Sequence, residues 1–271
     1  MIELSSETVR SDFARTTTLI PMAERPGVFE VELDDGWTSL VGIHGGYMCA
    51  LAVRGAEAVA PDRSVRTLTT TFLRNAAAGP ALLRVGEVRR GRSMSTIVAD
   101  LVQDDRVLLT SRLTAMTSRT GVEWTAPVAL GLPPVAECVP IEVERSRHFD
   151  RADALLDPSS LPFSGAPHAM VRGYLRPRGD RRVDAAWLAM AVDWFPPPAF
   201  VRVTPPAGGV SIDLTTHIHR DAVLLEDDEW LCARFSVDTS AGGLAVEHGV
   251  ITTMTGIPVA ESFQTRLTAE G

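Results

Sequence analysis

The sequence predicts an α+β protein in which two helix-plus-antiparallel-sheet repeats form one continuous sheet. Each half of the 271-residue chain has an apolar segment that ends at a proline and is followed by several strand-like segments, an internal repeat that points to two similar units. The strand-like segments alternate in polarity, whereas both apolar segments are apolar nearly all round, which indicates helices surrounded by protein. A curved antiparallel sheet that encloses a helix satisfies both patterns, as would any α+β domain with two buried helices.

In the first half, the helical segment covers residues 45–59 (GGYMCALAVRGAEAV) and ends before Pro61. Proline cannot continue a helix, so it marks the end of the segment. The strand-like segments that follow are residues 65–74, 81–89, 95–103 and 107–116. Asp104 and Asp105 join the last two, which predicts a hairpin turn.

The second half repeats this order. Its helical segment covers residues 184–195 (DAAWLAMAVDWF) and ends before Pro196. Strands are predicted at residues 210–220, 230–239, 245–254 and 258–267, with Thr255 and Gly256 in the last turn. Strict alternation on the first of these strands would place Ser211, Asp213, Thr215 and His217 on one face, opposite Ile212, Leu214, Thr216 and Ile218. The final strands of the two halves end alike, in SRLTA (111–115) and TRLTA (265–269).

Between the halves, residues 119–182 contain many prolines, which is typical of a long crossing linker rather than a packed domain. The sequence therefore predicts an N-terminal unit over residues 1–118, a linker over residues 119–182 and a C-terminal unit over residues 183–271. We expect the C-terminal unit to carry the catalytic residues.

Composition excludes several classes of protein. The net charge is −8 and the basic residues are scattered, so we expect no nucleic-acid partner, because phosphate binding needs a basic surface. The three cysteines are far apart and form no Cys-x-x-Cys pair, which argues against a disulfide framework or a zinc site. The N-terminal residues form no signal peptide, and no stretch reaches the ~18 apolar residues of a spanning helix. We therefore expect a cytoplasmic protein without a membrane partner.

Several common active-site motifs do not occur in the sequence, namely the GxSxG elbow, the GxGxxG fingerprint and the P-loop. His217 and His219 could form a metal-binding pair with Asp213 nearby, but a zinc site needs a further ligand and supporting hydrogen bonds. Two histidines on a polar strand face are more often solvated. We therefore expect no metal and no cofactor.

Asp193 is the most informative single residue. It follows the apolar run 185–192 and precedes Trp194, Phe195 and three prolines. The negative end of the helix dipole disfavours a carboxylate there, and apolar neighbours remove its solvent. Two interpretations remain open: an acid that turns out to water, or a carboxylate held in a cleft to orient or deprotonate a water molecule.

Six short motifs carry a resemblance to a known family. They are residues 41–46 (VGIHGG), 72–74 (FLR), 90–93 (RGRS), 188–193 (LAMAVD), 211–213 (SID) and 263–265 (FQT). These motifs resemble the acyl-CoA thioesterase II group of double-hotdog enzymes, and the resemblance covers residues 37–266, least closely in the linker. It implies a double hotdog fold.

Carried over from this family, the catalytic residues would be Asp193, Ser211 and Gln264. Ser211 stands where the family has threonine, and Thr215, on the same predicted strand face, is an alternative hydroxyl. A thioester needs no strong nucleophile, so a water polarised by these groups can attack it directly. The expected substrate-binding residues are His44, Gly45 and Gly46, because glycine N–H groups at a helix start suit an oxyanion.

The resemblance implies hydrolysis of an acyl-CoA to CoA and a free fatty or other carboxylic acid, a reaction of lipid metabolism. Two alternatives remain: a non-catalytic hotdog protein that binds acyl-CoA, and a hydratase or dehydratase on the same scaffold. Hydratases of that kind use an Asp and a His in a Gly-Asp-x-Asn-Pro setting, which this sequence lacks. We expect two chains to form a homodimer, because two fused hotdogs still leave a self-complementary sheet surface or edge.

Overall fold

A single large sheet organises the molecule. The structure is a computed structural model that describes residues 12–141, 143–144, 146–179, 181–203, 208–220 and 222–269. Within these residues, a 13-stranded sheet has the order β1-β2-β6-β7-β8-β5-β13-β17-β16-β15-β11-β10-β9, and all its pairings are antiparallel. One continuous sheet is the predicted architecture. The first eleven residues, in which no signal peptide is expected, lie outside the described residues.

The N-terminal half follows the predicted order closely. Its central helix α2 (Gly45–Val59) has the predicted bounds and begins at the N-cap His44, whose Nδ1 accepts a hydrogen bond from the Tyr47 N–H. Asp104 and Asp105 have φ angles of 50° and 58°, which is the left-handed geometry of a tight hairpin turn. The strands and the short first helix are α1 (Asp12–Thr16), β1 (Ile20–Pro21), β2 (Val28–Leu33), β5 (Ser64–Phe72), β6 (Gly79–Arg90), β7 (Met94–Gln103) and β8 (Arg106–Met116).

The C-terminal half repeats this plan with a shorter helix. The helix α3 (Ala185–Ala191) begins at the N-cap Asp184, whose carboxylate accepts from the Trp187 N–H. It ends earlier than predicted because residues 196–198 are all proline, and the chain leaves helical geometry before them. The remaining elements are β12 (Arg182–Asp184), α4 (Ala199–Arg202), β13 (Gly208–Ile218), β14 (Ala222–Leu224), β15 (Leu231–Ala241), β16 (Leu244–Thr253) and β17 (Pro258–Ala269).

The interval 119–182 differs from the expected crossing linker. It contains β9 (Val139–Pro140), β10 (Ala152–Leu156) and β11 (Ala169–Pro177), which extend the sheet beyond β15. Only the first part of this interval, before β9, crosses between the halves without forming a strand. There the Val128 N–H donates to the Gly256 carbonyl over 2.8 Å, and Leu130 packs on outward side chains of β11, β15 and β16. The division into units at residues 118 and 183 stays a prediction.

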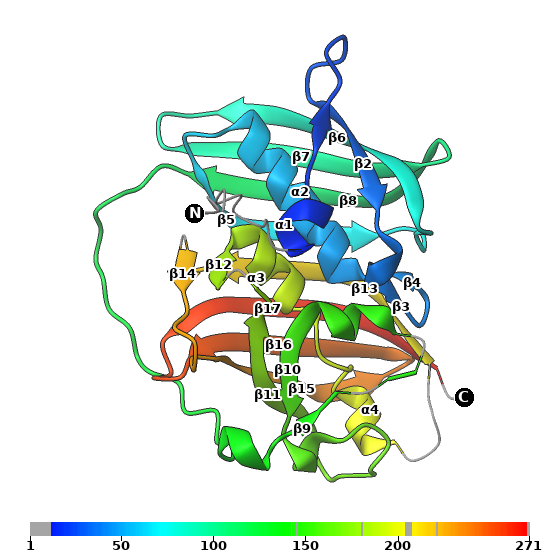
Figure 1. Cartoon of the computed structure of the whole chain (residues 1–271), viewed down its shortest axis with the longest axis vertical. Helices are drawn as coiled ribbons and strands as arrows, with labels where there is room; N and C mark the ends of the chain where they lie inside the picture. The colour runs from blue at the N-terminus through cyan, green and yellow to red at the C-terminus, as the bar shows by residue number, and fades with distance from the viewer. Residues whose placement is uncertain are drawn as a thin grey trace, which may run out of the picture.

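The two halves meet in the middle of the sheet and between the two main helices. In Figure 1 the strands run from β6 and β7 at the top to β15 and β11 below, with α2 and α3 on one face. The halves join where β5 pairs with β13, with Thr69 opposite Thr215. The core lies between this helix pair and the sheet, and its largest fully buried side chains include Trp37, Trp187 and Trp194. No helix in the described ranges is long and apolar enough to span a membrane.

Candidate active site

The side chain of Asp193 is buried between the two halves. Asp193 lies one residue beyond the C-cap of α3, and the N-terminus of α2 packs against it. Its side chain is only 7% exposed, and its Oδ2 accepts a hydrogen bond from the Gly46 N–H over 2.9 Å. The interpretation of Asp193 as an acid turned out to water is therefore wrong. The positive end of the α2 dipole offsets the negative end of α3 at this carboxylate.

The structure brings Asp193, Ser211 and Gln264 together from three elements. The Gln264 amide on β17 donates to Asp193 Oδ1 over 2.9 Å. The same amide nitrogen donates to the hydroxyl of Ser211 on β13 over 2.7 Å. The three predicted residues thus form one hydrogen-bonded group, although they are up to 71 positions apart in the chain.

A β-bulge turns Ser211 into this group. Ser211 pairs with Arg266 and Asp213 pairs with Thr265, so the register shifts at Ile212. An extra residue in one strand reverses the side-chain alternation beyond it. Ser211 therefore faces the helices, whereas Thr215 lies on the outer face and donates to Thr69 over 3.2 Å. The prediction of Thr215 as an alternative hydroxyl is wrong for this reason.

Arg266 belongs to the same group, and the sequence analysis did not identify it. Its guanidinium donates to Asp193 Oδ1 (3.0 Å), to Ser211 Oγ (2.9 Å) and to Gln264 Oε1 (2.7 Å). On its other side, Arg266 Nε donates to Glu247 Oε2 on β16 over 3.1 Å. The signal that could have found Arg266 is its position two residues after Gln264, on the same strand face. Nothing comparable in the sequence points to Glu247.

The residues at the start of α2 have different roles in the hydrogen-bond network. Both ring nitrogens of His44 are engaged, since Nδ1 accepts from the Tyr47 N–H and Nε2 donates to the Asp193 carbonyl over 2.8 Å. The Gly46 N–H is taken by the Asp193 carboxylate. The Gly45 N–H has no acceptor among the described residues. Of the three expected substrate-binding residues, Gly45 alone offers a free backbone donor.

Charge at the site follows from burial and from the hydrogen bonds. Burial alone would raise the pKa of Asp193, but Arg266, together with the Gln264 and Gly46 donors, holds it below its usual value of 3.8. Burial lowers the pKa of His44 below 6.5. The ring of His148 stacks on His44 with centroids 4.4 Å apart, and burial places its pKa well below 6.5. At neutral pH the site therefore holds an ionised aspartate next to uncharged imidazoles.

A cavity of about 660 Å³ opens beside this group. Gly45, Asp193, Ser211 and Arg266 all contribute to its wall. Much of the remaining lining is aromatic and comes from Phe72, Phe149, Phe163, Trp194 and Phe200. Exposed residues of two loops, Leu40, Val41, Leu73 and Arg74, also line it and mark its mouth. A polar cluster at the wall of an apolar cavity suits a ligand with one reactive polar group and an apolar chain.

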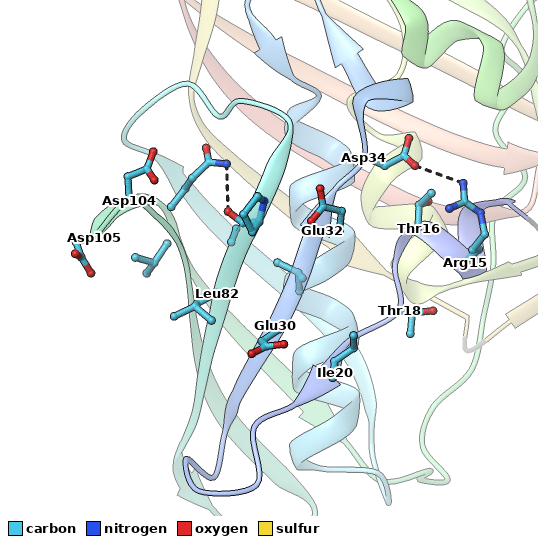
Figure 2. Close-up of a pocket in the computed structure, with 15 residues that line it drawn as sticks. Arg15, Thr16, Thr18, Ile20, Glu30, Glu32, Asp34, Leu82, Asp104 and Asp105 are labelled. Carbon is cyan, nitrogen blue, oxygen red and sulfur yellow. Dashed lines mark hydrogen bonds and ion pairs between the residues drawn. The ribbon is translucent and has the colours of Figure 1, made fainter.

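A second cavity, of about 710 Å³, lies at the outer edge of the N-terminal half. Figure 2 shows the carboxylates of Glu30 and Glu32 on β2, of Asp34 just after β2, and of Asp104 and Asp105 in the β7–β8 turn. This acidic lining repels an anionic ligand and contains none of the predicted site residues. Across the described residues, no cluster of three or more His, Cys, Asp or Glu side chains could hold a metal ion.

The continuous sheet with two helix-plus-sheet halves defines a double-hotdog protein. The family model of the acyl-CoA thioesterase N-terminal domain matches residues 33–119, and the model of the acyl-CoA thioesterase C-terminal domain matches residues 125–268. The chain therefore belongs to the acyl-CoA thioesterase family, and it is a thioester hydrolase that acts on acyl-CoA.

Solved structures share the fold over nearly the whole chain. A protein provisionally named a thioesterase II from Thermobifida fusca YX is 24% identical with a TM-score of 0.83, and the match covers 96% of this chain and 98% of that one. A hot dog fold protein of unknown function from Alicyclobacillus acidocaldarius is 20% identical with a TM-score of 0.84, at 96% and 98% coverage. The acyl-CoA thioesterase II TesB2 of Mycobacterium marinum is 22% identical with a TM-score of 0.74, also at 96% and 98%. Among the curated proteins compared, none matches this chain.

Proposed function

We propose that the protein hydrolyses acyl-CoA by direct attack of a water molecule that Asp193 deprotonates. The observation that carries this proposal is the buried, ionised Asp193 at the cavity wall, with one oxygen left open. Oδ1 already accepts two hydrogen bonds, from Gln264 and Arg266, whereas Oδ2 accepts one, from the Gly46 N–H. Oδ2 is therefore the oxygen that can take a proton from water.

The Ser211 hydroxyl is the second group that can hold the water. Ser211 Oγ accepts from Gln264 Nε2 and from Arg266 Nη1, so both of its lone pairs are occupied. Its hydrogen is then free to donate, and a water that accepts it can donate in turn to Asp193 Oδ2. Gln264 has both amide hydrogens engaged with Asp193 and Ser211. It therefore acts by holding these two groups in place.

The reaction balances without a covalent intermediate. The water oxygen attacks the thioester carbonyl carbon, and Asp193 Oδ2 takes the proton that the water loses. The free Gly45 N–H, at the positive end of α2, stabilises the negative charge on the carbonyl oxygen. When the carbon–sulfur bond breaks, the thiolate of CoA leaves and receives the proton from Asp193, and the acyl group leaves as a carboxylic acid.

The lining of the cavity supports the proposal that the acyl group of the substrate is apolar and binds inside it. Its aromatic lining suits a fatty or other apolar acyl chain, which would place the enzyme in lipid metabolism. Leu40, Val41 and Leu73 are exposed at the mouth, where the pantetheine arm would lie. Arg74 lies at the same mouth and is exposed, so its guanidinium is available to pair with a CoA phosphate.

The decisive experiment measures free-thiol release from a panel of acyl-CoAs of different chain length. We expect release by the wild type and a loss of ~10²–10⁴-fold in kcat for Asp193→Asn, with little change in substrate affinity. Asp213→Asn is the matched control, because Asp213 lies on β13 two residues from Ser211 but on the outer face. Binding without thiol release for any substrate would establish a non-catalytic acyl-CoA binder. An Asp193→Asn variant with more than about a third of wild-type turnover would remove Asp193 from the mechanism.

We also propose a homodimer and a cytoplasmic location. Phe263 and Val246 are 48% and 56% exposed on the outer face of β17 and β16, next to Leu244, and a second copy would cover this apolar surface. Light scattering should then give a dimeric mass that Phe263→Glu converts to a monomeric one, and a monomeric wild type would contradict the proposal.

The cysteines support the cytoplasmic location. All three are free thiols, as in proteins of a reducing compartment.

A further inference from the structure

One buried guanidinium contacts every member of the predicted triad. The side chain of Arg266 is 10% exposed and reaches inward from β17. Nη2 donates to Asp193 Oδ1 and to Gln264 Oε1, and Nη1 donates to Ser211 Oγ, over 2.7–3.0 Å. An arginine is suited to this arrangement because its planar fork presents several donors in fixed directions.

Glu247 binds the Nε side of the Arg266 guanidinium, away from the Nη atoms that contact the three predicted residues. Its side chain is 4% exposed, and its carboxylate accepts from Arg266 Nε over 3.1 Å, so the guanidinium lies between two buried carboxylates. Buried ion pairs contribute little to stability, and apolar residues of similar volume often replace them without loss. Stability alone therefore does not account for a Glu–Arg–Asp chain of charges at this position.

The Arg266 guanidinium determines which hydrogen-bonding atoms of Asp193 and Ser211 remain free to bind water. Without Arg266, Asp193 Oδ1 would keep only the Gln264 donor, and a water could bind at either carboxylate oxygen. Ser211 Oγ would likewise keep one free lone pair, and its hydroxyl hydrogen could turn toward the protein. With Arg266 in place, Oδ2 is the open acceptor and the Ser211 hydrogen is the open donor.

We propose that Arg266, held by Glu247, is a positioning residue of the hydrolytic site, which selects Asp193 Oδ2 and the Ser211 hydrogen as the two atoms that bind the attacking water. This inference rests on the proposed function. Arg266 acts through Asp193 and Ser211, because four of its five N–H donors are engaged with protein acceptors.

Arg266 and Glu247 carry opposite charges, so they affect the ionisation of Asp193 in opposite directions. The Arg266 charge lowers the pKa of Asp193 against the effect of burial. Burial raises the pKa of Glu247, and the charge of Asp193 adds to this effect. Because repulsion between like charges is mutual, an ionised Glu247 opposes the ionisation of Asp193. The other titratable groups near Asp193 are His44 and His148, whose pKa values are lowered by burial, and Cys49, whose pKa is raised by burial to about 12.

The test compares Arg266→Gln with Glu247→Gln. We expect Arg266→Gln to lower kcat by roughly 10–100-fold with little change in KM, because the water is no longer fixed. It should also move the acid limb of the kcat/KM profile to higher pH, whereas Glu247→Gln should move that limb to lower pH. Arg112→Gln is the control, since Arg112 occupies the matching SRLTA segment of β8 but is exposed. If Arg266 and Glu247 had a purely structural role, both variants would lose activity, but the acid limbs of their kcat/KM profiles would not move in opposite directions.

A direct titration separates this inference from the proposed function. Carbon-13 NMR of labelled aspartate carboxyls, with Asp193→Asn to assign the signal, reports the Asp193 pKa without any substrate. If the wild type releases no thiol, the proposed function fails and the titration still decides how Arg266 acts. An unchanged Asp193 pKa and kcat in Arg266→Gln would overturn the proposal.

A double variant covers the case in which a single variant does not fold. Arg266→Met combined with Glu247→Leu removes one charge of each sign, so Glu247 is not left in the core without its partner. A folded double variant with a raised Asp193 pKa and a reduced kcat supports the proposal. A folded double variant with wild-type values of both contradicts it.

Discussion

Gly46→Ala tests whether the close approach of the two helices positions the carboxylate of Asp193. Gly46 lies where the start of α2 meets the end of α3. A Cβ atom built on it would lie 2.4 Å from the Met190 carbonyl oxygen, 2.9 Å from His44 Cε1 and 3.0 Å from Asp193 Cβ. The Met190 oxygen belongs to the backbone of α3, and Asp193 Cβ is fixed to the turn after it. Rotation of a flexible side chain therefore relieves neither of these two contacts.

The size of the effect follows from these distances. Ordinary van der Waals contact begins at 3.4 Å, so the methyl group must push the Met190 carbonyl away by about 1 Å. This shift lengthens the 2.9 Å hydrogen bond from the Gly46 N–H to Asp193 Oδ2. A misplacement of ~1 Å at a reacting group can cost about 10²-fold in rate. Overpacking of the helix contact should lower the free energy of unfolding by ~1–3 kcal/mol.

The assay measures kcat by thiol release and stability by urea unfolding. Gly86→Ala is the matched control, because Gly86 lies in β6 and a Cβ there meets no atom within 4 Å. We expect the control to keep wild-type kcat. If Gly46→Ala also keeps kcat to within about two-fold, the contact between α2 and the turn after α3 does not position Asp193 for catalysis, and the reasoning fails.

Three further predictions concern other parts of the site. Ser211→Ala should lower kcat, whereas Ser211→Thr should retain or improve it, because the β-branch restricts the hydroxyl rotamer; a silent Ser211→Ala would contradict the water-holding role. Thr215→Val should leave kcat unchanged, since Thr215 contacts Thr69 on the outer face. Burial depresses the pKa of His148, so the unfolded state binds its proton first as pH falls below 6.5, and stability declines below that pH. His148→Phe should therefore flatten the pH dependence of urea unfolding in that range, and an unchanged slope would refute this.

Local sequence patterns predicted most of the regular structure. The bounds of α2 agree with the predicted residues 45–59, and the eight predicted strands lie within about two residues of the observed ones. These elements follow from properties that act over short distances, namely apolar periodicity, proline at helix ends and turn residues between strands. Asp193 could also be identified from the sequence, because an acid in an apolar segment lacks solvent wherever that segment folds.

The similar strand ends show where such patterns mislead. SRLTA in β8 and TRLTA in β17 match in four of five letters, yet Arg112 is exposed and Arg266 is buried. A shift of one residue in register moves every side chain to the other face of a sheet. Which face each arginine occupies depends on pairing with neighbouring strands, and those strands are distant in sequence.

The sequence by itself determined the repeated helix-and-strand plan and the family, and it pointed to three residues that the structure brings into one hydrogen-bonded group. Only the tertiary structure decided that Ser211 rather than Thr215 faces the helices, because this depends on the bulge at Ile212. It also decided that Arg266 and Glu247 complete the group. Both outcomes depend on strand register, which is fixed when the whole sheet packs around α2 and α3, and no local pattern of residues encodes it.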